Sequence, residues 1–293
     1  MPAHRPGPQG PSSQPTSMPA SMFTVSTRVA AGAAALVVSL SAASSMARIP
    51  AGRYVPLYTF PVATALPGRI SAPVPTSRRA VGAFEMDVYP VTNAEFLVFL
   101  RAHPEWQRSK ASRLFVDASY LRHWRGDLDP GENAPDRSPV VHVSWFAARA
   151  YLRAQGKTLP TVDQWEYVAA ADERRTDASR DPAFHERLRL WYGRPTPARL
   201  PTVGSTIRNA YGVHDLHGLV WEWTLDFNST FISGESRADA SRDRTLYCGS
   251  GSVNASNFED YAAFMRYAFR SSLQARYGVA NLGFRGVRPL SDR

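Results

Sequence analysis

The stretch YGVHDLHGLVWEW, residues 211–223, gathers side chains that are well suited to bind a cation. His214 and His217 stand three positions apart, a spacing that occurs in transition-metal sites, but no third histidine or cysteine lies nearby to complete such a site. Asp215 and Glu222 add two carboxylates to the same stretch. The stretch is therefore a metal site, one wall of a catalytic site, or a well-packed core loop, and the residue types alone do not distinguish these three interpretations.

The chain has one cysteine, Cys248, which excludes an intramolecular disulfide. This thiol is either a buried structural group or a reactive one. Without disulfides, the stability of the fold has to come from the core or from bound ions.

The elements that position these groups are short. We expect strands over residues 48–58 and 83–89, and a third strand over PVVHVSW, residues 139–145. Residues 105–139 form an irregular insertion whose aromatic residues indicate packing. The chain after Arg194 alternates turn residues with short apolar runs, and we expect loops there.

Four helix starts are predicted from capping residues. Thr92 with Glu95, and Thr161 with Gln164, have the spacing of capping boxes. Further helices are expected over residues 145–155, after Ser144, and over residues 181–192, where Asp-Pro opens the helix; these starts are typical N-terminal signals. The fold class is therefore α+β, with a single domain over residues 48–293 and no internal repeat.

Residues 1–47 are expected to lie outside the fold, as an extension followed by a cleaved signal peptide. Arg28 precedes the apolar run VAAGAAALVVSLSA, and Ser45-Met46-Ala47 has the small residues of a cleavage site. The run is shorter than the roughly 20 residues that cross a bilayer. We expect a mature N-terminus near Arg48, a periplasmic or secreted protein, and no membrane span after cleavage. A buried or amphipathic helix is the alternative.

The formal net charge of +9 does not indicate a nucleic-acid partner. Lys110 and Lys157 are the only lysines, and the arginines are spread along the chain instead of forming a stripe. We therefore expect no nucleic-acid binding.

Four stretches occur in the order typical of one family, and they cover most of residues 49–288: MDVYPVTNAEFLVFL, PVVHVSWFAARAYLRAQGKTLPTVDQWEYVAAA, NAYGVHDLHGLVWEW and NLGFRGVR. On these stretches the chain resembles the formylglycine-generating enzymes, also called the sulfatase-modifying-factor family. The resemblance implies a domain related to C-type lectins, rich in irregular structure and usually exported.

The best-known members of that family hold one copper ion between two cysteines. The matching positions here fall near Asn257 and Ala262, or, counted from the Gly-rich side, near residues 254–255 and 259–260. None of them is a cysteine, and soft thiolates are the ligands with which this family position would hold Cu(I). We therefore expect neither copper at this place nor formylglycine-generating activity.

Oxygen-bearing side chains replace the thiolates: Asn254, Asn257, Glu259, Asp260 and Tyr261. The resemblance places Arg270 and Asn281 in the same cavity, with Trp221 near its wall. We take Glu259, Arg270 and Asn281 as catalytic candidates, because a carboxylate beside an arginine positions an acidic or phenolic substrate or acts as a base. The alternative is that Glu259 and Asp260 are solvated loop carboxylates.

The resemblance also implies a calcium site, held by the side chains of Asp215 and Glu222 and the carbonyl groups of Gly218 and Val220. Two carboxylates and two carbonyls supply hard oxygen ligands of the kind that Ca²⁺ prefers. A second family calcium site is lost, because its aspartate falls at Gly204. The alternatives are a hydrogen-bonded core loop and a transition metal at His214 and His217. His142, inside the predicted third strand, is expected to be a packing residue.

We expect a maturation or accessory factor without formylglycine-generating activity. RAHPEW, HDLHGLVWEW and the Cys-Gly turn resemble accessory proteins encoded beside copper nitrite reductases, which makes such a reductase the candidate partner. If the chain is an enzyme, it is an oxidoreductase unlike the copper-cysteine members, acting on a siderophore chromophore as in the pyoverdine-maturation branch. A third alternative is a ligand-binding module without chemistry. Neighbouring genes would distinguish these functions.

Overall fold

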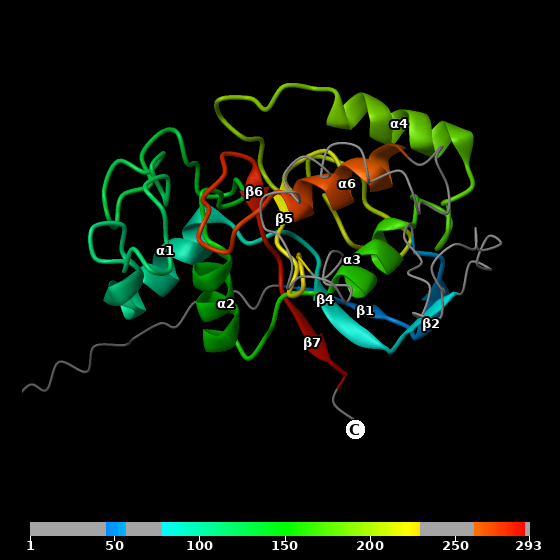
Figure 1. The fold of residues 1–293 in the computed structure, drawn as a ribbon, viewed down its shortest axis with the longest axis horizontal. Helices are drawn as coiled ribbons and strands as arrows, with labels where there is room; N and C mark the ends of the chain where they lie inside the picture. Colours follow the sequence, from blue (N-terminus) through cyan, green and yellow to red (C-terminus); the bar gives the residue numbers. More distant parts are fainter. Residues whose placement is uncertain (1–44, 57–77, 229–260, 291–293) are drawn as a thin grey trace, which may run out of the picture. The chain divides into compact units, whose positions relative to one another are not determined.

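Strands from both ends of the described chain meet in one antiparallel sheet (Figure 1). In this sheet, strand β4 (Phe84–Asp87) lies between β1 (Met46–Ile49) and β7 (Val287–Pro289). Phe84 and Met86 are buried, as the alternation along a strand with one face on the core requires. The computed structural model describes residues 45–56, 78–228 and 261–290, which all belong to one compact unit.

Two smaller sheets complete the strands. β2 (Gly52–Tyr54) and β3 (Arg79–Val81) form an antiparallel pair. β5 (Trp221–Glu222) and β6 (Leu282–Gly283) form a parallel pair in which Trp221 is opposite Leu282. This short pair brings the stretch 211–223 next to the C-terminal NLGFR motif.

All four helix starts predicted from the sequence are confirmed. Both predicted capping boxes are formed, and Ser144 and Asp181 accept hydrogen bonds from backbone N–H groups of the first turn. The helices that begin there are α1 (Asn93–Ala102), α2 (Trp145–Ala154), α3 (Val162–Ala169) and α4 (Pro182–Tyr192).

The expectation of loops throughout the chain after Arg194 was wrong. Residues Tyr261–Ser271 form helix α6, which packs beside α4 (Figure 1). Ala262, Ala263 and Tyr267 are buried, so the segment has the apolar spacing of a helix face. A short 3-10 helix, η1 (Pro104–Trp106), stands at the start of the irregular insertion.

The predicted strand over residues 139–145 is not formed. Pro139 makes an isolated bridge to Thr92, but His142 has a φ of +55°, in the left-handed region. A positive φ lies outside the β region, so one such residue ends a regular strand ladder. The apolar alternation of PVVHV therefore reflects burial of Val140, Val141 and Val143 and not a strand.

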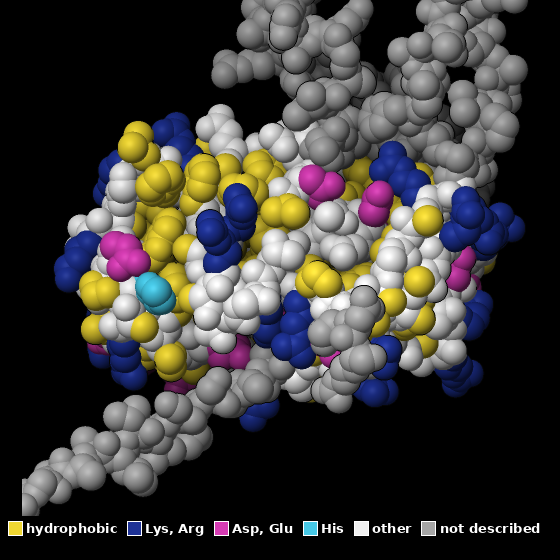
Figure 2. Space-filling view, turned by 90° about the horizontal axis from the view of Figure 1, so that it is seen from below, with side chains coloured by type: hydrophobic (Ala, Val, Ile, Leu, Met, Phe, Trp, Pro, Cys, Tyr) yellow, Lys and Arg dark blue, Asp and Glu magenta, His cyan; other side chains and the backbone are white. Residues whose placement is uncertain are grey.

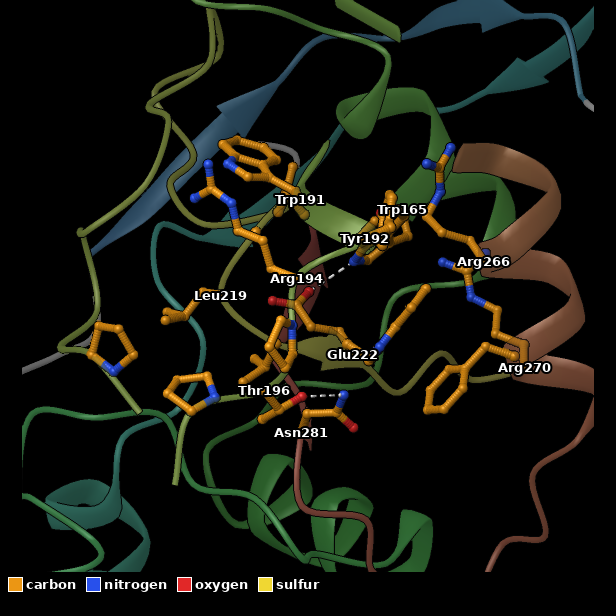
Figure 3. Close-up of a pocket in the computed structure, with 18 residues that line it drawn as sticks. Trp165, Trp191, Tyr192, Arg194, Thr196, Leu219, Glu222, Arg266, Arg270 and Asn281 are labelled. Carbon is orange, nitrogen blue, oxygen red and sulfur yellow. Dashed lines mark hydrogen bonds between the residues drawn. The ribbon is translucent and has the colours of Figure 1, made fainter. Parts of the chain in front are cut away.

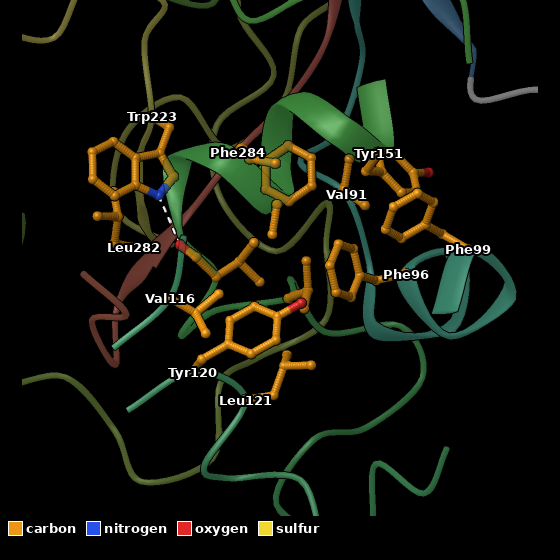
Figure 4. Packing of buried hydrophobic residues seen from close by; sticks show 14 of the residues in the cluster. Val91, Phe96, Phe99, Val116, Tyr120, Leu121, Tyr151, Trp223, Leu282 and Phe284 are labelled. Carbon is orange, nitrogen blue, oxygen red and sulfur yellow. Dashed lines mark hydrogen bonds between the residues drawn. The ribbon is translucent and has the colours of Figure 1, made fainter. Parts of the chain in front are cut away.

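The main core lies where α1, α2 and the irregular insertion meet (Figure 4). Trp124 and Tyr120, from the insertion, are almost fully buried there. The indole of Trp223 is also buried, and its N–H donates to the Val143 carbonyl at 2.8 Å. The insertion thus packs as its aromatic content predicted, and the end of the stretch 211–223 is anchored in the core.

The family resemblance and the structure agree on a mixed helix and sheet domain with several small sheets.

On the face shown in Figure 2, lysine and arginine side chains are scattered among apolar and neutral ones. In the parts of the chain that the structure describes, no helix has both the length and the apolar character to cross a membrane.

Candidate functional site

A cavity of about 360 Å³ is formed where α6, the end of α4 and the loop before β5 come together (Figure 3). The loop that follows α4 and the residue before β6 complete its wall. The lining residues are Trp165, Trp191, Tyr192, Arg194, Pro195, Thr196, Pro197, Pro201, Leu216, Gly218, Leu219, Val220, Trp221, Glu222, Arg266, Phe269, Arg270 and Asn281. Elements from four distant parts of the sequence thus build one site.

Three aromatic rings form a stack along this cavity. Trp221 lies between Tyr192 and Phe269, with ring centroids 4.8 and 4.5 Å apart and interplanar angles of 28° and 27°. The three rings come from β5, α4 and α6, so the stack fixes these elements relative to one another. Such offset contacts contribute about 0.5–1.5 kcal/mol each beyond the burial of area.

Gly218 is required for the shape of the wall. Its φ is +90°, and a Cβ at this position would lie 2.8 Å from the ring of Trp191. A side chain would therefore need a strained backbone and would also push the Trp191 ring out of place.

A buried ion-pair network stands behind the aromatic stack. Glu166, on α3, accepts hydrogen bonds from Arg266 at 2.7 Å and from Arg270 at 2.6 Å. All three side chains are at least nine-tenths buried. Burial alone raises the pKa of Glu166, but the two guanidinium groups reverse this and lower the pKa to about 2. Glu166 therefore stays ionised and holds both arginines at the cavity.

Glu222 belongs to a second buried ion pair at the cavity. Arg285 donates to both carboxylate oxygens of Glu222 at 2.7–3.0 Å, and the indole of Trp165 donates to one of them at 2.7 Å. The side chains of Glu222 and Arg285 are fully buried. Arg285 also donates to three backbone carbonyls, so the whole guanidinium group is engaged.

The rim of the cavity is polar. Asn281 donates a hydrogen bond from its side-chain amide to the Thr196 hydroxyl at 3.0 Å (Figure 3). Arg194 is exposed at the rim, and within the described residues its side chain has no hydrogen bond or ion pair.

The charges of the described cavity lining do not balance. Among the residues that the structure describes, Arg194, Arg266 and Arg270 line the cavity together with one carboxylate, Glu222. When the buried partners Glu166 and Arg285 are included, four arginines face two glutamates. The described lining therefore favours an anionic ligand, and its aromatic side chains favour a planar one.

A family model, the sulfatase-modifying factor enzyme 1-like domain, matches residues 37–290. The chain belongs to this family. It is 30% identical to the formylglycine-generating enzyme of Streptomyces coelicolor over 281 residues, covering 81% of this chain and 87% of that protein. It is also 30% identical to inactive C-alpha-formylglycine-generating enzyme 2 of Bos taurus over 219 residues, covering 61% and 70%. Among solved structures, PvdO from Pseudomonas aeruginosa aligns with a TM-score of 0.43 and 18% identity, over 84% of this chain and 94% of that one.

In this sulfatase-modifying factor enzyme 1-like protein, some of the residues singled out from the sequence come together and others do not. Arg270, Asn281 and Trp221 all line the cavity. Glu259, Asn254, Asn257, Asp260 and Cys248 lie outside the described residues. Ala262, which matches one copper-cysteine position, is buried in α6 beside Phe184 and Leu188.

The residues expected to hold calcium are arranged differently from a calcium cage. The carboxylate of Asp215 accepts hydrogen bonds from the Gly204 and Thr206 backbone and from the Thr206 hydroxyl. Both oxygens of Glu222 face a guanidinium group, whose positive charge opposes a second cation at the same oxygens. Ca²⁺ needs six to eight available oxygens, so this arrangement does not fit the ion.

The histidines of the same stretch have separate surroundings. His214 packs on Tyr89, with ring centroids 4.9 Å apart. Both ring nitrogens of His217 are used, one with the Ala169 carbonyl at 2.8 Å and one with the Tyr192 hydroxyl at 3.2 Å. Within the described chain, no group of three His, Cys, Asp or Glu side chains is placed to hold a metal.

The buried His217 makes stability depend on pH. Burial lowers its pKa to about 3, and the nearby Arg266 adds to this effect. The unfolded chain takes up the proton first, so stability falls as the pH drops below the ordinary pKa of about 6.5.

When the pH drops from 6.5 to 5, the wild type is expected to lose unfolding free energy, and ordinary carboxylates are still mostly ionised in this range. We expect this loss to be smaller by about 2 kcal/mol in His217→Gln. Urea unfolding at several pH values measures this difference. His103→Gln, at an exposed histidine, is the control, and equal slopes for wild type and His217→Gln would contradict the assignment.

Proposed function

We propose that this protein binds a planar, anionic group in its cavity and acts as a maturation or accessory factor that does not make formylglycine. The proposal rests on the described part of the cavity wall, in which arginines outnumber carboxylates beside a stack of three aromatic rings. Cavities of this kind, mostly apolar with a few convergent polar groups, are typical ligand sites.

Arg270 is the residue best placed to recognise the anion. Its Nη1 group donates to Glu166, and the described residues offer no acceptor to its Nε and Nη2 groups. A guanidinium carries five N–H donors in a planar fork, which suits a carboxylate, a sulfonate or a phenolate. Asn281 supplies a neutral amide on the same wall, and its carbonyl oxygen accepts from a hydroxyl-bearing ligand.

The absence of a cysteine pair in the sequence supports the second part of the proposal. Cys248 is the only cysteine, so two thiolates of one chain are not available to hold copper. One related protein carries the name inactive C-alpha-formylglycine-generating enzyme 2, so loss of the activity is known in this family.

Incubation with a cysteine-containing sulfatase peptide under air is expected to give no formylglycine, with or without added copper. Mass spectrometry of the peptide measures the conversion, and the Streptomyces coelicolor relative is the positive control. Turnover above that of a protein-free reaction would refute this part, and Cys248→Ser would then be the next variant to test.

An oxidoreductase acting on a planar substrate, such as a siderophore chromophore, is a second candidate function. The same aromatic stack and arginine surplus favour it, since such a substrate is both planar and acidic. Oxygen uptake distinguishes the two functions, because an oxidase consumes dioxygen when its substrate is added and an accessory protein does not. A copper nitrite reductase remains the proposed partner for the accessory role.

Export to the periplasm is part of the proposal. Strand β1 begins at Met46, where its backbone pairs with Asp87, so a cleaved chain that keeps the sheet intact starts at or before Met46. This start lies slightly upstream of Arg48, the start expected from the sequence. Intact-mass measurement of the protein from the periplasmic fraction is expected to show an N-terminus at or shortly before Met46. Recovery of only the uncleaved chain from the cytoplasm would contradict export.

A further inference from the structure

A second, smaller cavity lies beside two histidines that the proposed function does not use. His123, from the irregular insertion, and His142, from the segment before α2, have ring centroids 5.1 Å apart at an interplanar angle of 37°. The cavity next to them has a volume of about 180 Å³. Its lining residues are Asn93, His123, Asn133, Ser138, Pro139, Val141, His142, Thr196, Pro197, Ala198, Leu200 and Ala280.

The ring nitrogens of this pair are available to a ligand. Nδ1 of His142 lies 3.3 Å from the Gly278 carbonyl, so it carries the proton and leaves Nε2 with its lone pair. Both nitrogens of His123 are buried, and no described residue forms a hydrogen bond with either. A buried polar atom without a partner costs roughly 1–3 kcal/mol, which a bound ligand would recover.

The backbone holds His142 in place at a cost. Its φ of +55° is unusual for a residue with a side chain. Two hydrogen bonds enforce it: its N–H donates to the Val279 carbonyl and its carbonyl accepts from Leu121, both at 2.9 Å. Gly278 allows this approach, because a Cβ there would lie 3.0 Å from the His142 carbonyl oxygen. Backbone strain of this kind is concentrated at functional sites.

The donor set selects the kind of ligand. A histidine that binds a metal commonly donates its other N–H to a backbone carbonyl, as His142 does. Burial lowers the pKa of His123 to about 4, so its ring is neutral at neutral pH. The described lining of the cavity holds no carboxylate and no thiolate, which leaves the two imidazoles as the nitrogen donors.

The nearby charges decide between a monovalent and a divalent ion. Arg108 lies close enough to hydrogen-bond to the carbonyls of Leu121 and Trp124, and together with Arg122 it lowers the pKa of His123. These positive charges oppose a bound cation, and the opposition doubles for a dication. Zn²⁺ sites in proteins use three or four protein ligands, whereas a d¹⁰ monocation that accepts two-coordinate geometry is satisfied by two imidazoles.

We propose that His123 and His142 form a two-imidazole binding site for Cu⁺, with the adjoining cavity leaving room for one exogenous ligand. Neither histidine lines the larger cavity or matches a copper-cysteine position of the family, although Thr196 and Pro197 line both cavities.

The test is a titration with Cu⁺ under anaerobic conditions against a chromogenic chelator, and with Ag⁺ as a redox-inert analogue. The protein carries Cys248→Ser, because a thiol would compete for both ions. We expect one ion per chain, with Ag⁺ shifting the ring ¹⁵N signals of two histidines. His123→Phe keeps an aromatic ring without donors, and His142→Asn keeps a residue that tolerates positive φ.

Each of these variants is expected to weaken Cu⁺ binding by at least about 100-fold, since loss of an outer partner of a ligand already costs about 10–100-fold. His103→Gln, which removes an exposed histidine, is expected to change nothing. Thermal unfolding without metal shows that each variant is folded. Cu⁺ affinity that is undetectable in the parent, or unchanged in both folded variants, would overturn the proposal, and so would equal affinity for Zn²⁺.

Discussion

Replacing Glu222 by glutamine is expected to lower the free energy of unfolding by about 3–5 kcal/mol, the usual effect of removing one partner of a buried ion pair. The reason is that Arg285 would keep its charge in a fully buried position without a counterion. Glutamine keeps the shape of the side chain and an acceptor for the indole of Trp165, so the loss reports the charge and not a cavity. Urea unfolding at pH 7 measures the difference.

The matched control is Glu85→Gln, which breaks the half-exposed pair between Glu85 and Arg288. Exposed pairs contribute about 0–1 kcal/mol, so this variant is expected to stay close to the wild type. Equal effects at Glu222 and Glu85 would contradict the assignment.

A chelator distinguishes the ion pair from the calcium site expected from the sequence. If Arg285 is the counterion of Glu222, removing calcium leaves the unfolding midpoint of the wild type unchanged. A midpoint that falls on chelation and recovers with added calcium would show that Glu222 binds the metal instead.

The pair between Glu222 and Arg285 shows what could be predicted from the sequence. One partner was singled out and the other was not. The motif HGLVWEW identified Glu222 as an important carboxylate, but its partner lies 63 residues further along the chain. Likewise, Arg270 was identified from its family position, whereas the pair that holds it in place, with Glu166, spans 104 residues. Periodicity and motif order do not report contacts over such separations, which depend on how the elements pack.

Local features were predicted more reliably than regular structure in the second half. The capping boxes at Thr92 and Thr161 involve residues three apart, so a short sequence window is enough to detect them. Helix α6 was missed because we expected loops throughout the chain after Arg194, although the segment that forms α6 has the apolar period of a helix. The strand over PVVHV was predicted from alternation, and the left-handed His142 could not be foreseen from residue types.

Arg270→Gln is the second substitution with a large expected effect, on ligand binding. The probe is 2-naphthoate, a planar carboxylate, and its neutral partner is 2-naphthamide. A hydrogen bond to a charged group contributes about 1.5–3 kcal/mol, so the variant is expected to bind 2-naphthoate about 10–100-fold more weakly. Glu166 keeps Arg266 as its counterion, so we expect the variant to fold. Arg187→Gln, at an exposed pair with Glu173, is the control.

The most direct test of the account is therefore the affinity of the wild-type protein for this ligand pair, measured by calorimetry and by quenching of tryptophan fluorescence. A cavity with surplus arginine beside the Trp221 stack predicts that 2-naphthoate binds more tightly than 2-naphthamide, and that Arg270→Gln removes the preference while Arg187→Gln keeps it. Equal affinity of the wild type for the acid and the amide, or a preference that survives in Arg270→Gln, would contradict the claim that this cavity recognises a planar anion.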